Sequence, residues 1–539
     1  MVVSNWGSEE MDTVTAAFAR SVAQHPDRLF VDFAGEQRTY AEFDRDSNAL
    51  ANGLRELGVK PGQPLAALLD NNIDVGLFWI ATVKAGAVAA PLNCALKGEF
   101  LRNQLDVCES EIIVCESEYA ERLVDIIAKL PRLHTVVYRG RRPSLDVAQL
   151  TLVDLTDLYR GSSAPLSDNN KPGDLASLIF TSGTTGLSKG CMLSHNYIMH
   201  NSRQVIETDD RQPGEVMWSC LPFFHFNAIG CTFLAAALLG GSAYFAKRFS
   251  LSGFWGDIQR SGATAASLLG VMIPLVANQA DTPAMVACKG QLRLIAGAPF
   301  PASIAKVYRE RFGVKRIGSN CYGTTEACLL TMLPLGIEPR PNASGVRSPA
   351  FDVRIFDEND QECAPGVAGE VVARPLKPHI MFEGYYRAPE ATLKVYRNLW
   401  YHSGDIGMFD AEGYFFFLDR KKDYLRRGGE NISMHEMESA FIDHPDIIEV
   451  AAHAVPSELS EDDVKITAVL RAGAILKEEE LCRWSVERVP YYAVPRYIEF
   501  RRELPKTPTG KVEKFLLRDE GRTAETWDRQ ASSFVLEKR

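Results

Sequence analysis

The feature that most limits what this chain can fold into is a polar, glycine-rich loop that directly follows a hydrophobic segment. The loop reads TSGTTGLSKG at residues 181–190, and residues 175–180 before it are mostly apolar. A short apolar run that ends in such a loop predicts a buried strand leading into a phosphate-binding loop. Glycines let backbone N–H groups approach an anion, hydroxyls donate hydrogen bonds to phosphate oxygens, and Lys189 supplies a positive charge.

Two other interpretations of this loop are less favoured. The P-loop of NTPases requires Gly-Lys followed by Ser or Thr, whereas Gly190 follows Lys189 here. A flexible Ser/Gly linker would usually lack the strand before it and the apolar pattern after it. The sequence therefore predicts a nucleotide loop of another kind.

Length and composition indicate a protein of several domains. The chain has 539 residues, of which 46% are hydrophobic and 24% charged, a balance typical of soluble globular proteins. Its net charge of −10 disfavours nucleic acid as a partner, because domains that bind nucleic acids usually present a basic face. The 11 cysteines include no Cys-x-x-Cys pair, and residues 1–13 contain no basic residue. We therefore expect reduced thiols, no signal peptide and a cytoplasmic location.

One uncharged segment, residues 228–246, is long enough to raise the question of a transmembrane span. It is rich in small residues and is interrupted by Gly240 and Gly241. This pattern favours a buried helix followed by a strand at residues 242–246, and no transmembrane segment is expected.

The predicted fold class is α/β, with parallel sheets wrapped by helices. Strand and helix patterns alternate after the predicted helix at residues 39–57, and they alternate again after residue 216. The expected strands are residues 65–69, 87–91, 111–114, 216–220, 263–267, 292–296 and 316–320, and the expected helices between the first three are residues 74–85 and 99–107.

The sequence pattern changes twice in the last third of the chain. Short alternating strands predict a small β-rich, barrel-like module at about residues 345–421. The charged run DRKKD at residues 419–423 is either a solvated turn or a hinge into a small α+β domain. We expect an N-terminal domain of residues 1–421 and a mobile C-terminal domain of residues 422–539.

Read together, five motifs resemble those of one enzyme superfamily. Besides the loop at residues 181–190 they are YGTTE at 322–326, YHSGD at 401–405, DRKKD at 419–423 and PTGK at 508–511. In this order they are similar to the adenylate-forming superfamily of acyl-CoA ligases, peptide-synthetase adenylation domains and luciferases. The segment RGGENIS at 427–433, with Phe254 and Trp255, is most similar to bacterial ligases of the crotonobetaine/carnitine-CoA ligase type.

The resemblance implies an AMP-forming acyl-CoA ligase that uses ATP, Mg²⁺ and CoA. The acid would first form acyl-AMP and pyrophosphate, and a thiol would then displace AMP. The family often has proline directly before the loop lysine, where this chain has Ser188. The residues implied in ATP binding are Thr181, Ser182, Gly183, Thr184, Thr185, Gly186, Lys189, Gly297, Ala298, Pro299, Tyr322, Gly323, Thr324, Asp405 and Arg420.

Individual roles also follow from the resemblance. Tyr322 would stack on adenine, Asp405 and Arg420 would bind the ribose, and Glu326 with Thr184 would help to hold Mg²⁺. The implied catalytic residues are Lys511, which would stabilise charge in adenylation, Thr325 at the α-phosphate, and His225.

The small C-terminal domain of this family alternates between two arrangements, one for adenylation and one for thioester formation. By resemblance, Lys422 occupies the hinge position. Gly428 and Gly429 would line the tunnel for the pantetheine arm of CoA, because absent side chains leave room for a narrow chain.

His225 lies in LPFFHFN at residues 221–227 and matches a gate beside the reacting carboxylate; otherwise it is an ordinary core histidine. The expected acyl pocket is apolar, which favours a hydrophobic monocarboxylic acid, bulky or alicyclic. Its candidate residues, inferred from their proximity to the motifs, are Phe226, Asn227, Gly270, Val271, Met272, Gly297, Gly318, Cys321 and Cys328.

Several alternatives stay open at this point. A stand-alone adenylation enzyme would load a carrier-protein thiol instead of CoA. A carnitine-like acid would require an aromatic cage or an acid near its cation. A nucleotide-binding regulator would bind ATP without turnover, and a luciferase-like oxygenase shares the first step. A homodimer is the default oligomer.

Overall fold

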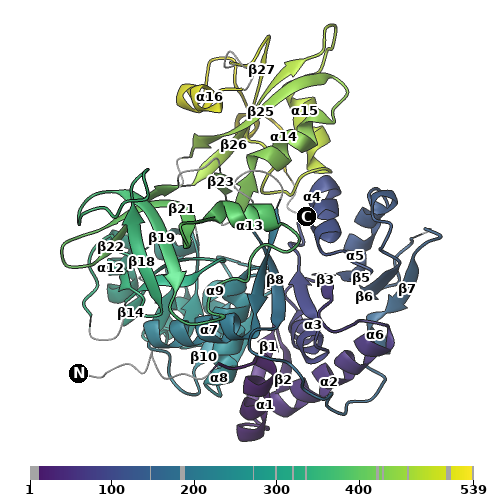
Figure 1. Cartoon of the computed structure of the whole chain (residues 1–539), viewed down its shortest axis with the longest axis vertical. Coiled ribbons are helices and arrows are strands. Elements are labelled where there is room, and N and C mark those ends of the chain that lie inside the picture. Colours follow the sequence, from purple (N-terminus) through teal and green to yellow (C-terminus); the bar gives the residue numbers. More distant parts are fainter. Residues whose placement is uncertain are drawn as a thin grey trace.

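The large N-terminal part is built around two mostly parallel sheets, and the C-terminal domain lies above them in Figure 1. The α/β class predicted from the sequence is confirmed. The computed structural model describes residues 11–145, 147–181, 188–270, 272–297, 300, 302–318, 321–333, 337–420, 424–427, 430–457, 461–505 and 512–536.

The first sheet carries the predicted phosphate loop at one edge. Its strands run parallel except for the last pair, which is antiparallel. In spatial order they are β7 (Thr151–Asp154), β6 (Thr135–Arg139), β5 (Ile112–Glu116), β3 (Pro64–Leu68), β4 (Val88–Pro91), β8 (Leu175–Thr181) and β9 (Lys189–Ser194). The predicted strands at residues 65–69, 87–91 and 111–114 are confirmed as β3, β4 and β5.

The second sheet is parallel except for its final pair, β1 and β2. In spatial order its strands are β14 (Arg316–Ile317), β13 (Leu294–Ala296), β12 (Ala265–Ser267), β10 (Val216–Ser219), β11 (Ser242–Phe245), β1 (Leu29–Phe33) and β2 (Glu36–Thr39). The strands predicted around residues 216, 263, 292 and 316 are confirmed. The last is shorter than predicted, and Ser319 and Asn320 lie outside the described residues.

Helices surround both sheets and share a continuous core with them. The sequence of α3 is apolar on every side, as expected for a helix buried on all faces. The helices of the large part are α1 (Val14–Gln24), α2 (Tyr40–Glu56), α3 (Ile73–Lys84), α4 (Gly98–Val107), α5 (Ser117–Ala120), α6 (Leu155–Leu158), α7 (His195–Thr208), α8 (Ala235–Leu238), α9 (Phe254–Ser261), α10 (Met272–Asn278), α11 (Pro283–Ala287), α12 (Ala302–Glu310) and α13 (Pro389–Val395).

Local sequence signals explain the ends of α2. The Glu42 N–H donates to the Thr39 hydroxyl at 3.2 Å, and the Thr39 N–H donates to the Glu42 carboxylate at 2.8 Å. This capping box satisfies two backbone donors that the first helical turn leaves unpaired. At the other end Gly58 has φ of 104°, a conformation that glycine adopts at little cost. The helix predicted at residues 39–57 is therefore confirmed.

The uncharged segment is buried in the large part. Residues Asn227–Leu234 form a π-helix that continues into α8, and β11 follows. The predicted helix and strand are thus confirmed, except that the first part of the helix has π geometry. Within the described residues, no helix is long and apolar enough to cross a membrane.

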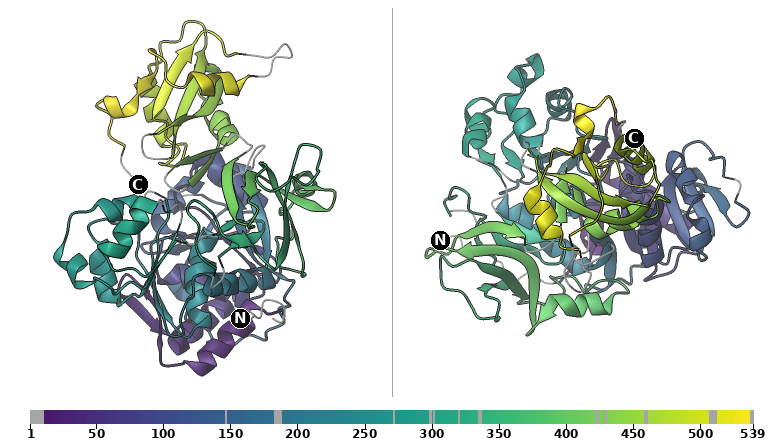
Figure 2. Two further views of the ribbon diagram at one scale, coloured as in Figure 1. Left: turned by 90° about the vertical axis from the view of Figure 1, so that its left-hand side faces the viewer. Right: turned by 90° about the horizontal axis from the view of Figure 1, so that it is seen from above.

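A β-rich module follows the second sheet and lies to one side of the large part (Figure 2). A small antiparallel sheet contains β15 (Tyr322–Thr324), β16 (Cys328–Met332) and β17 (Val346–Arg347). A larger antiparallel sheet contains β18 (Phe351–Phe356), β19 (Gly369–Pro375), β20 (Tyr396–Arg397), β21 (Trp400–Phe409) and β22 (Phe415–Arg420).

The C-terminal domain has its own sheet and helices. A hairpin of β23 (Tyr424–Arg427) and β24 (Glu430–Ser433) precedes the sheet β25 (Ile447–Pro456), β26 (Asp462–Leu470), β27 (Tyr497–Arg501) and β28 (Trp527–Asp528). Its helices are α14 (Met434–Ile442), α15 (Glu478–Val486) and α16 (Lys514–Glu520). One cluster of buried apolar side chains joins this domain to α4 and the first sheet, and includes Phe100, Leu101, Ile432, Met434 and Met437.

Candidate active site

The two ends of the predicted phosphate loop face each other across a hairpin. Thr181 ends β8, Lys189 begins β9, and the two residues are Cα partners in the antiparallel ladder. The predicted loop of residues 181–190 is therefore shorter than expected, because its ends belong to strands. The expected ligands Ser182, Gly183, Thr184, Thr185 and Gly186 lie outside the described residues.

Lys189 and Glu326, which the motifs place far apart in sequence, meet at Tyr385. The Lys189 ammonium lies 5.1 Å from the centroid of the Tyr385 ring, and the Tyr385 hydroxyl donates to Glu326 Oε1 at 2.8 Å. Burial and the nearby Glu326 carboxylate raise the pKa of the Cys191 thiol well above its usual value. The hairpin and the YGTTE motif therefore form one polar site with a cation and an anion.

Backbone and side-chain hydrogen bonds hold the YGTTE motif in place. Tyr197 on α7 donates to the carbonyl of Thr325 at 2.8 Å, and the Phe382 N–H donates to the carbonyl of Glu326, also at 2.8 Å. The hydroxyls of Thr324 and Tyr401 are 3.4 Å apart.

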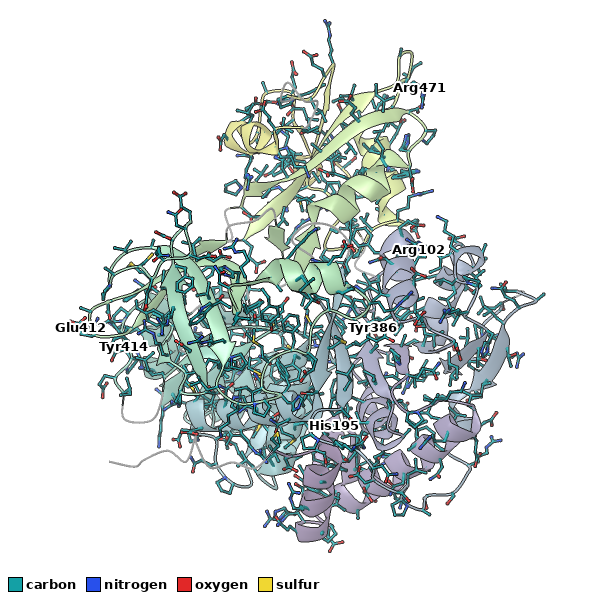
Figure 3. The ribbon with its side chains drawn as sticks, viewed as in Figure 1. Arg102, His195, Tyr386, Glu412, Tyr414 and Arg471 are labelled. Atoms are coloured by element: carbon teal, nitrogen blue, oxygen red, sulfur yellow. The ribbon has the colours of Figure 1, made fainter. Side chains whose placement is uncertain are left out.

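The hairpin is fixed to the same region. The backbone N–H of Tyr386, near the centre of the molecule in Figure 3, donates to the carbonyl of Gly190 at 2.8 Å. The motifs at residues 181–190 and 322–326 are thus held by the segment around residues 382–386.

The candidates for adenine and ribose binding are joined directly. The Tyr322 hydroxyl donates to Asp405 Oδ2 at 2.7 Å, and both residues are buried. The Tyr322 ring stacks on that of Phe417, with an interplanar angle of 28° and centroids 5.9 Å apart. Arg420 is the Cα partner of Asp405 across β21 and β22, and its side chain lies outside the described part.

Two of the predicted ATP-site glycines have a packing reason of their own. A Cβ on Gly297 would lie 1.9 Å from the carbonyl oxygen of Leu268, and a Cβ on Gly323 would lie 2.0 Å from that of Cys328. Glycine is required at both positions because two backbone segments touch there. Ala298 and Pro299 lie outside the described residues.

His225 lies at the boundary with the C-terminal domain. Its Nε2 is 3.0 Å from Oε1 of Glu430, and Glu430 is the first residue of β24. A cavity between the two parts is lined by Pro91, Asn93, Leu96, Phe100, Gln104, Phe180, Thr181, Ser188, Phe224, His225, Glu430, Ile432, Glu436 and Tyr492. This cavity brings the phosphate hairpin, His225 and the β23–β24 hairpin together.

The candidate acyl residues divide into several groups. The Phe226 ring packs edge-on against Tyr197 at a centroid distance of 5.6 Å, and the buried Cys328 thiol donates to the Tyr197 carbonyl at 3.8 Å. Met272 Sδ accepts from the Cys220 thiol at 3.8 Å. The first two contacts place Phe226 and Cys328 beside α7. The third places Met272 beside Cys220, directly after β10.

Other acyl candidates lie nearer the domain boundary or the chain's second sheet. A Cβ on Gly270 would lie 3.0 Å from Glu461 of the C-terminal domain, and one on Gly318 would lie 3.5 Å from the Phe300 ring. Cys321 is partly buried, and burial raises its thiol pKa. The side-chain oxygen of Asn227 is buried without a hydrogen-bond partner within the described structure. Val271 lies outside the described residues.

Four further predicted residues, Lys422, Gly428, Gly429 and Lys511, also lie outside them. The elements that flank these positions are described. The hairpin strands on either side of Gly428 and Gly429 face the large part, whereas α16, which begins shortly after Lys511, lies on the outer side of the C-terminal domain (Figure 1).

Sequence reasoning missed several side chains of this site, among them Tyr385, Tyr401 and Glu430. Tyr385 lies outside every motif, and its contact with Glu326 depends on folding. Tyr401 and Glu430 lie inside the motifs YHSGD and RGGENIS, so their motif membership was a usable signal. Only the Asp405 and glycine positions of those motifs were given roles.

Comparisons with known proteins find family models and relatives that cover most of this chain. A family model described as AMP-binding enzyme matches residues 18–386, and one described as AMP-binding enzyme C-terminal domain matches residues 436–511. A long-chain-fatty-acid–CoA ligase of Escherichia coli O157:H7 is 30% identical, with 94% of each chain covered. A feruloyl-CoA synthase of Amycolatopsis sp is 30% identical, with 92% of this chain and 96% of that protein covered.

Solved structures show the same fold. An o-succinylbenzoate CoA synthetase double mutant from Bacillus subtilis, bound with a product analogue, matches with a TM-score of 0.79 at 22% identity, covering 93% of this chain and 98% of the other. An amide bond synthetase from Marinactinospora thermotolerans matches with a TM-score of 0.78 at 25% identity, covering 93% and 99%.

Proposed function

Since this chain belongs to the AMP-binding enzyme family and is an AMP-forming acyl-CoA ligase by that membership, we propose that it activates a hydrophobic carboxylic acid, bulky or alicyclic, with ATP and transfers the acyl group to CoA. The observation that carries the proposal is the convergence of Lys189, Glu326, Tyr322 and Asp405, from distant motifs, in the region around Tyr385 and Tyr401.

The first step would form acyl-AMP and release pyrophosphate. Tyr322 would stack on adenine, and Asp405 with Arg420 would bind the ribose. Thr181, Lys189 and the loop between them would bind the β- and γ-phosphates. Reactions at phosphorus depend mainly on positioning and charge neutralisation, and this set of donors and cations suits both.

Mg²⁺ fits the site as a partner of ATP. Among the described residues, no cluster of three or more His, Cys, Asp or Glu side chains could hold a metal ion by itself. A single carboxylate, Glu326, together with phosphate oxygens matches the way in which proteins usually hold Mg²⁺. The ion would neutralise phosphate charge when bound, and Tyr385 would orient the Glu326 carboxylate toward it.

The second step would use the arrangement seen here. The β23–β24 hairpin faces the large part through Glu430 and His225, whereas Leu517 of α16 packs against Ala451 and Val469 on another face of the C-terminal domain. Gly428 and Gly429, which precede Glu430, and Lys511, which precedes α16, would each have to reach the same acyl-AMP. We infer that the domain turns between the two steps, with a hinge at Lys422, and that the present arrangement serves thioester formation.

The described surroundings of the candidate acyl residues favour an apolar acid. Phe226, Met272 and Cys328 have apolar or weakly polar side chains, and the buried Arg211 guanidinium is already paired with Asp209 at 2.9 Å. A second carboxylate on the acid would therefore gain no buried cation from this pair.

The test is mass spectrometry of products after incubation with ATP, Mg²⁺, CoA and a panel of aliphatic, aromatic, alicyclic and carnitine-like acids. A CoA thioester that requires ATP, with AMP as co-product, is the expected result, and a Lys511→Ala control should lack it. Acyl-AMP without thioester would indicate a carrier-protein acceptor instead. ATP binding with no AMP from any acid would contradict the proposal.

A further inference from the structure

The phosphate hairpin is attached to the C-terminal domain through one residue, Ser188, directly before Lys189. Both the backbone N–H and the hydroxyl of Ser188 donate to Oε1 of Glu436 on α14, at 2.9 and 2.8 Å. The side chain of Asn103 on α4 donates to the Ser188 carbonyl at 3.4 Å. Ser188 therefore has polar contacts with both the large part and the C-terminal domain.

The contact between Ser188 and Glu436 is buried, so its loss should cost free energy. Ser188 is 8% exposed and Glu436 is 5% exposed. Burial raises the pKa of the Glu436 carboxyl, while the two hydrogen bonds from Ser188 act in the opposite direction. Hydrogen bonds to a buried carboxylate are stronger than those between neutral groups.

The identity of residue 188 matters for this contact. Proline, which is common at this place in the enzymes that the chain resembles, has no N–H and no hydroxyl and could make neither hydrogen bond. Serine supplies both donors from a single residue. Serine thus stands where those enzymes often have proline. Its two donors meet an acceptor in another domain, Glu436, which lies 248 positions further along the chain.

We propose that Ser188 and Glu436 form a positioning contact that couples the phosphate hairpin to the docked arrangement of the C-terminal domain, and thereby favours the thioester step. The inference rests on the proposed function, since it assigns this arrangement to that step. Rotation of the domain for adenylation breaks both hydrogen bonds, which frees the residue next to Lys189 when ATP phosphates must bind. After pyrophosphate has left, the bonds form again and hold the domain in place.

The test measures the two half-reactions separately in wild type and in Glu436→Ala, Glu436→Gln and Ser188→Ala variants. Adenylation is followed by ATP–pyrophosphate exchange, and thioester formation by the single-turnover reaction of enzyme-bound acyl-AMP with CoA. Glu436→Ala should slow the thioester half-reaction by about tenfold or more relative to adenylation, the scale of one charge-assisted hydrogen bond. Glu436→Gln, which keeps an acceptor oxygen, should slow it less, and Ser188→Ala should fall between wild type and Glu436→Ala.

A direct readout of the contact is hydrogen exchange of the backbone amide of Ser188. This amide should exchange about tenfold faster in Glu436→Ala than in wild type, while amides within β9 keep their protection. Unchanged exchange together with an unchanged ratio of the half-reactions would overturn the inference. A wild-type enzyme that forms acyl-AMP but no CoA thioester would instead contradict the proposed function, whatever the exchange shows.

Discussion

Tyr322 and Asp405 belong to different sheets of the β-rich module, and the Tyr322 hydroxyl donates a 2.7 Å hydrogen bond to the Asp405 carboxylate. The pair joins the first residue of the YGTTE strand to the strand that carries YHSGD. An aromatic ring and a carboxylate are thereby held together, as the proposed nucleoside site requires.

Replacement of Asp405 by alanine should raise KM for ATP by about tenfold or more, because ribose hydroxyls lose a charged acceptor. Tyr322→Phe is the matched control, since it removes the same 2.7 Å hydrogen bond but keeps the ring, and it should have the smaller effect. Steady-state kinetics at varied ATP concentrations make the comparison. Equal KM values in wild type and Asp405→Ala would refute the ribose role.

Glu326→Gln should raise the Mg²⁺ concentration needed for half-maximal adenylation by about tenfold, because an amide oxygen binds Mg²⁺ more weakly than a carboxylate. Tyr385→Phe removes the hydrogen bond to Glu326 and keeps its charge, so its shift should be smaller. Magnesium titrations of ATP–pyrophosphate exchange measure both. A Glu326→Gln enzyme with the wild-type magnesium requirement would exclude Glu326 from the metal site.

Lys511→Ala should reduce ATP–pyrophosphate exchange by about a hundredfold or more, the usual loss when a donor to developing charge is removed. The reaction of supplied acyl-AMP with CoA should continue in this variant. If instead both half-reactions fell equally, the two faces of the C-terminal domain would not serve separate steps.

Glu430→Gln and His225→Ala should show the opposite pattern. They alter the 3.0 Å contact between the large part and the β23–β24 hairpin, so thioester formation should slow by about tenfold while adenylation is less affected. Single-turnover measurements with bound acyl-AMP give the thioester rate. A loss confined to adenylation would place His225 in the first step.

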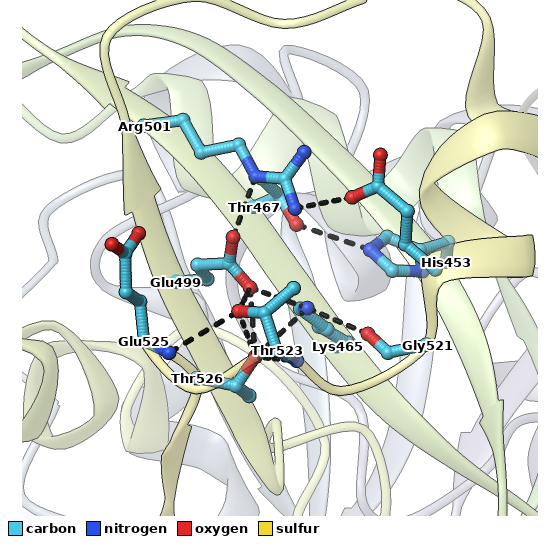
Figure 4. Close-up of polar contacts among 10 residues, drawn as sticks. His453, Lys465, Thr467, Glu499, Arg501, Gly521, Thr523, Glu525 and Thr526 are labelled. Atoms are coloured by element: carbon cyan, nitrogen blue, oxygen red, sulfur yellow. Dashed lines mark hydrogen bonds and ion pairs between the residues drawn. The ribbon is translucent and has the colours of Figure 1, made fainter.

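A buried ion pair should control the stability of the C-terminal domain. Lys465 donates to Glu499 at 2.6 Å, and Thr523 and Thr526 also donate to this carboxylate (Figure 4). Glu499→Ala should lower the free energy of unfolding by roughly 3 kcal/mol, because the ammonium of Lys465 would remain buried. Glu479→Ala, which breaks an exposed pair with Arg483, should cost less than about 1 kcal/mol in the same urea denaturation.

The same carboxylate predicts a pH dependence. Burial alone would raise the pKa of Glu499, but hydrogen bonds from Lys465, Thr526 and Arg501 outweigh it and lower the pKa from 4.5 to about 2. A lowered pKa in the folded state stabilises the fold above the unfolded value, and this contribution is lost as the pH falls from 4.5 toward 2. Acid unfolding of Glu499→Gln should therefore show a smaller dependence on pH in this range.

Much of the fold and part of the site could be predicted because they depend on local patterns. Apolar runs predicted β3, β4 and β5, and the helical pattern of residues 39–57 predicted α2. The polar, glycine-rich composition of residues 181–190 similarly indicated an anion site, although its ends proved to be paired strands.

Other features were decided only by the tertiary structure, because they join segments that no local pattern relates. Tyr385 reaches Glu326, Glu430 reaches His225, and Glu436 reaches Ser188 only after the sheets and the C-terminal domain have packed together. The sequence by itself thus determined the elements and the chemical types of the active-site residues. Packing decided which of those residues meet, because hydrogen-bond distance between remote positions is a property of the folded backbone.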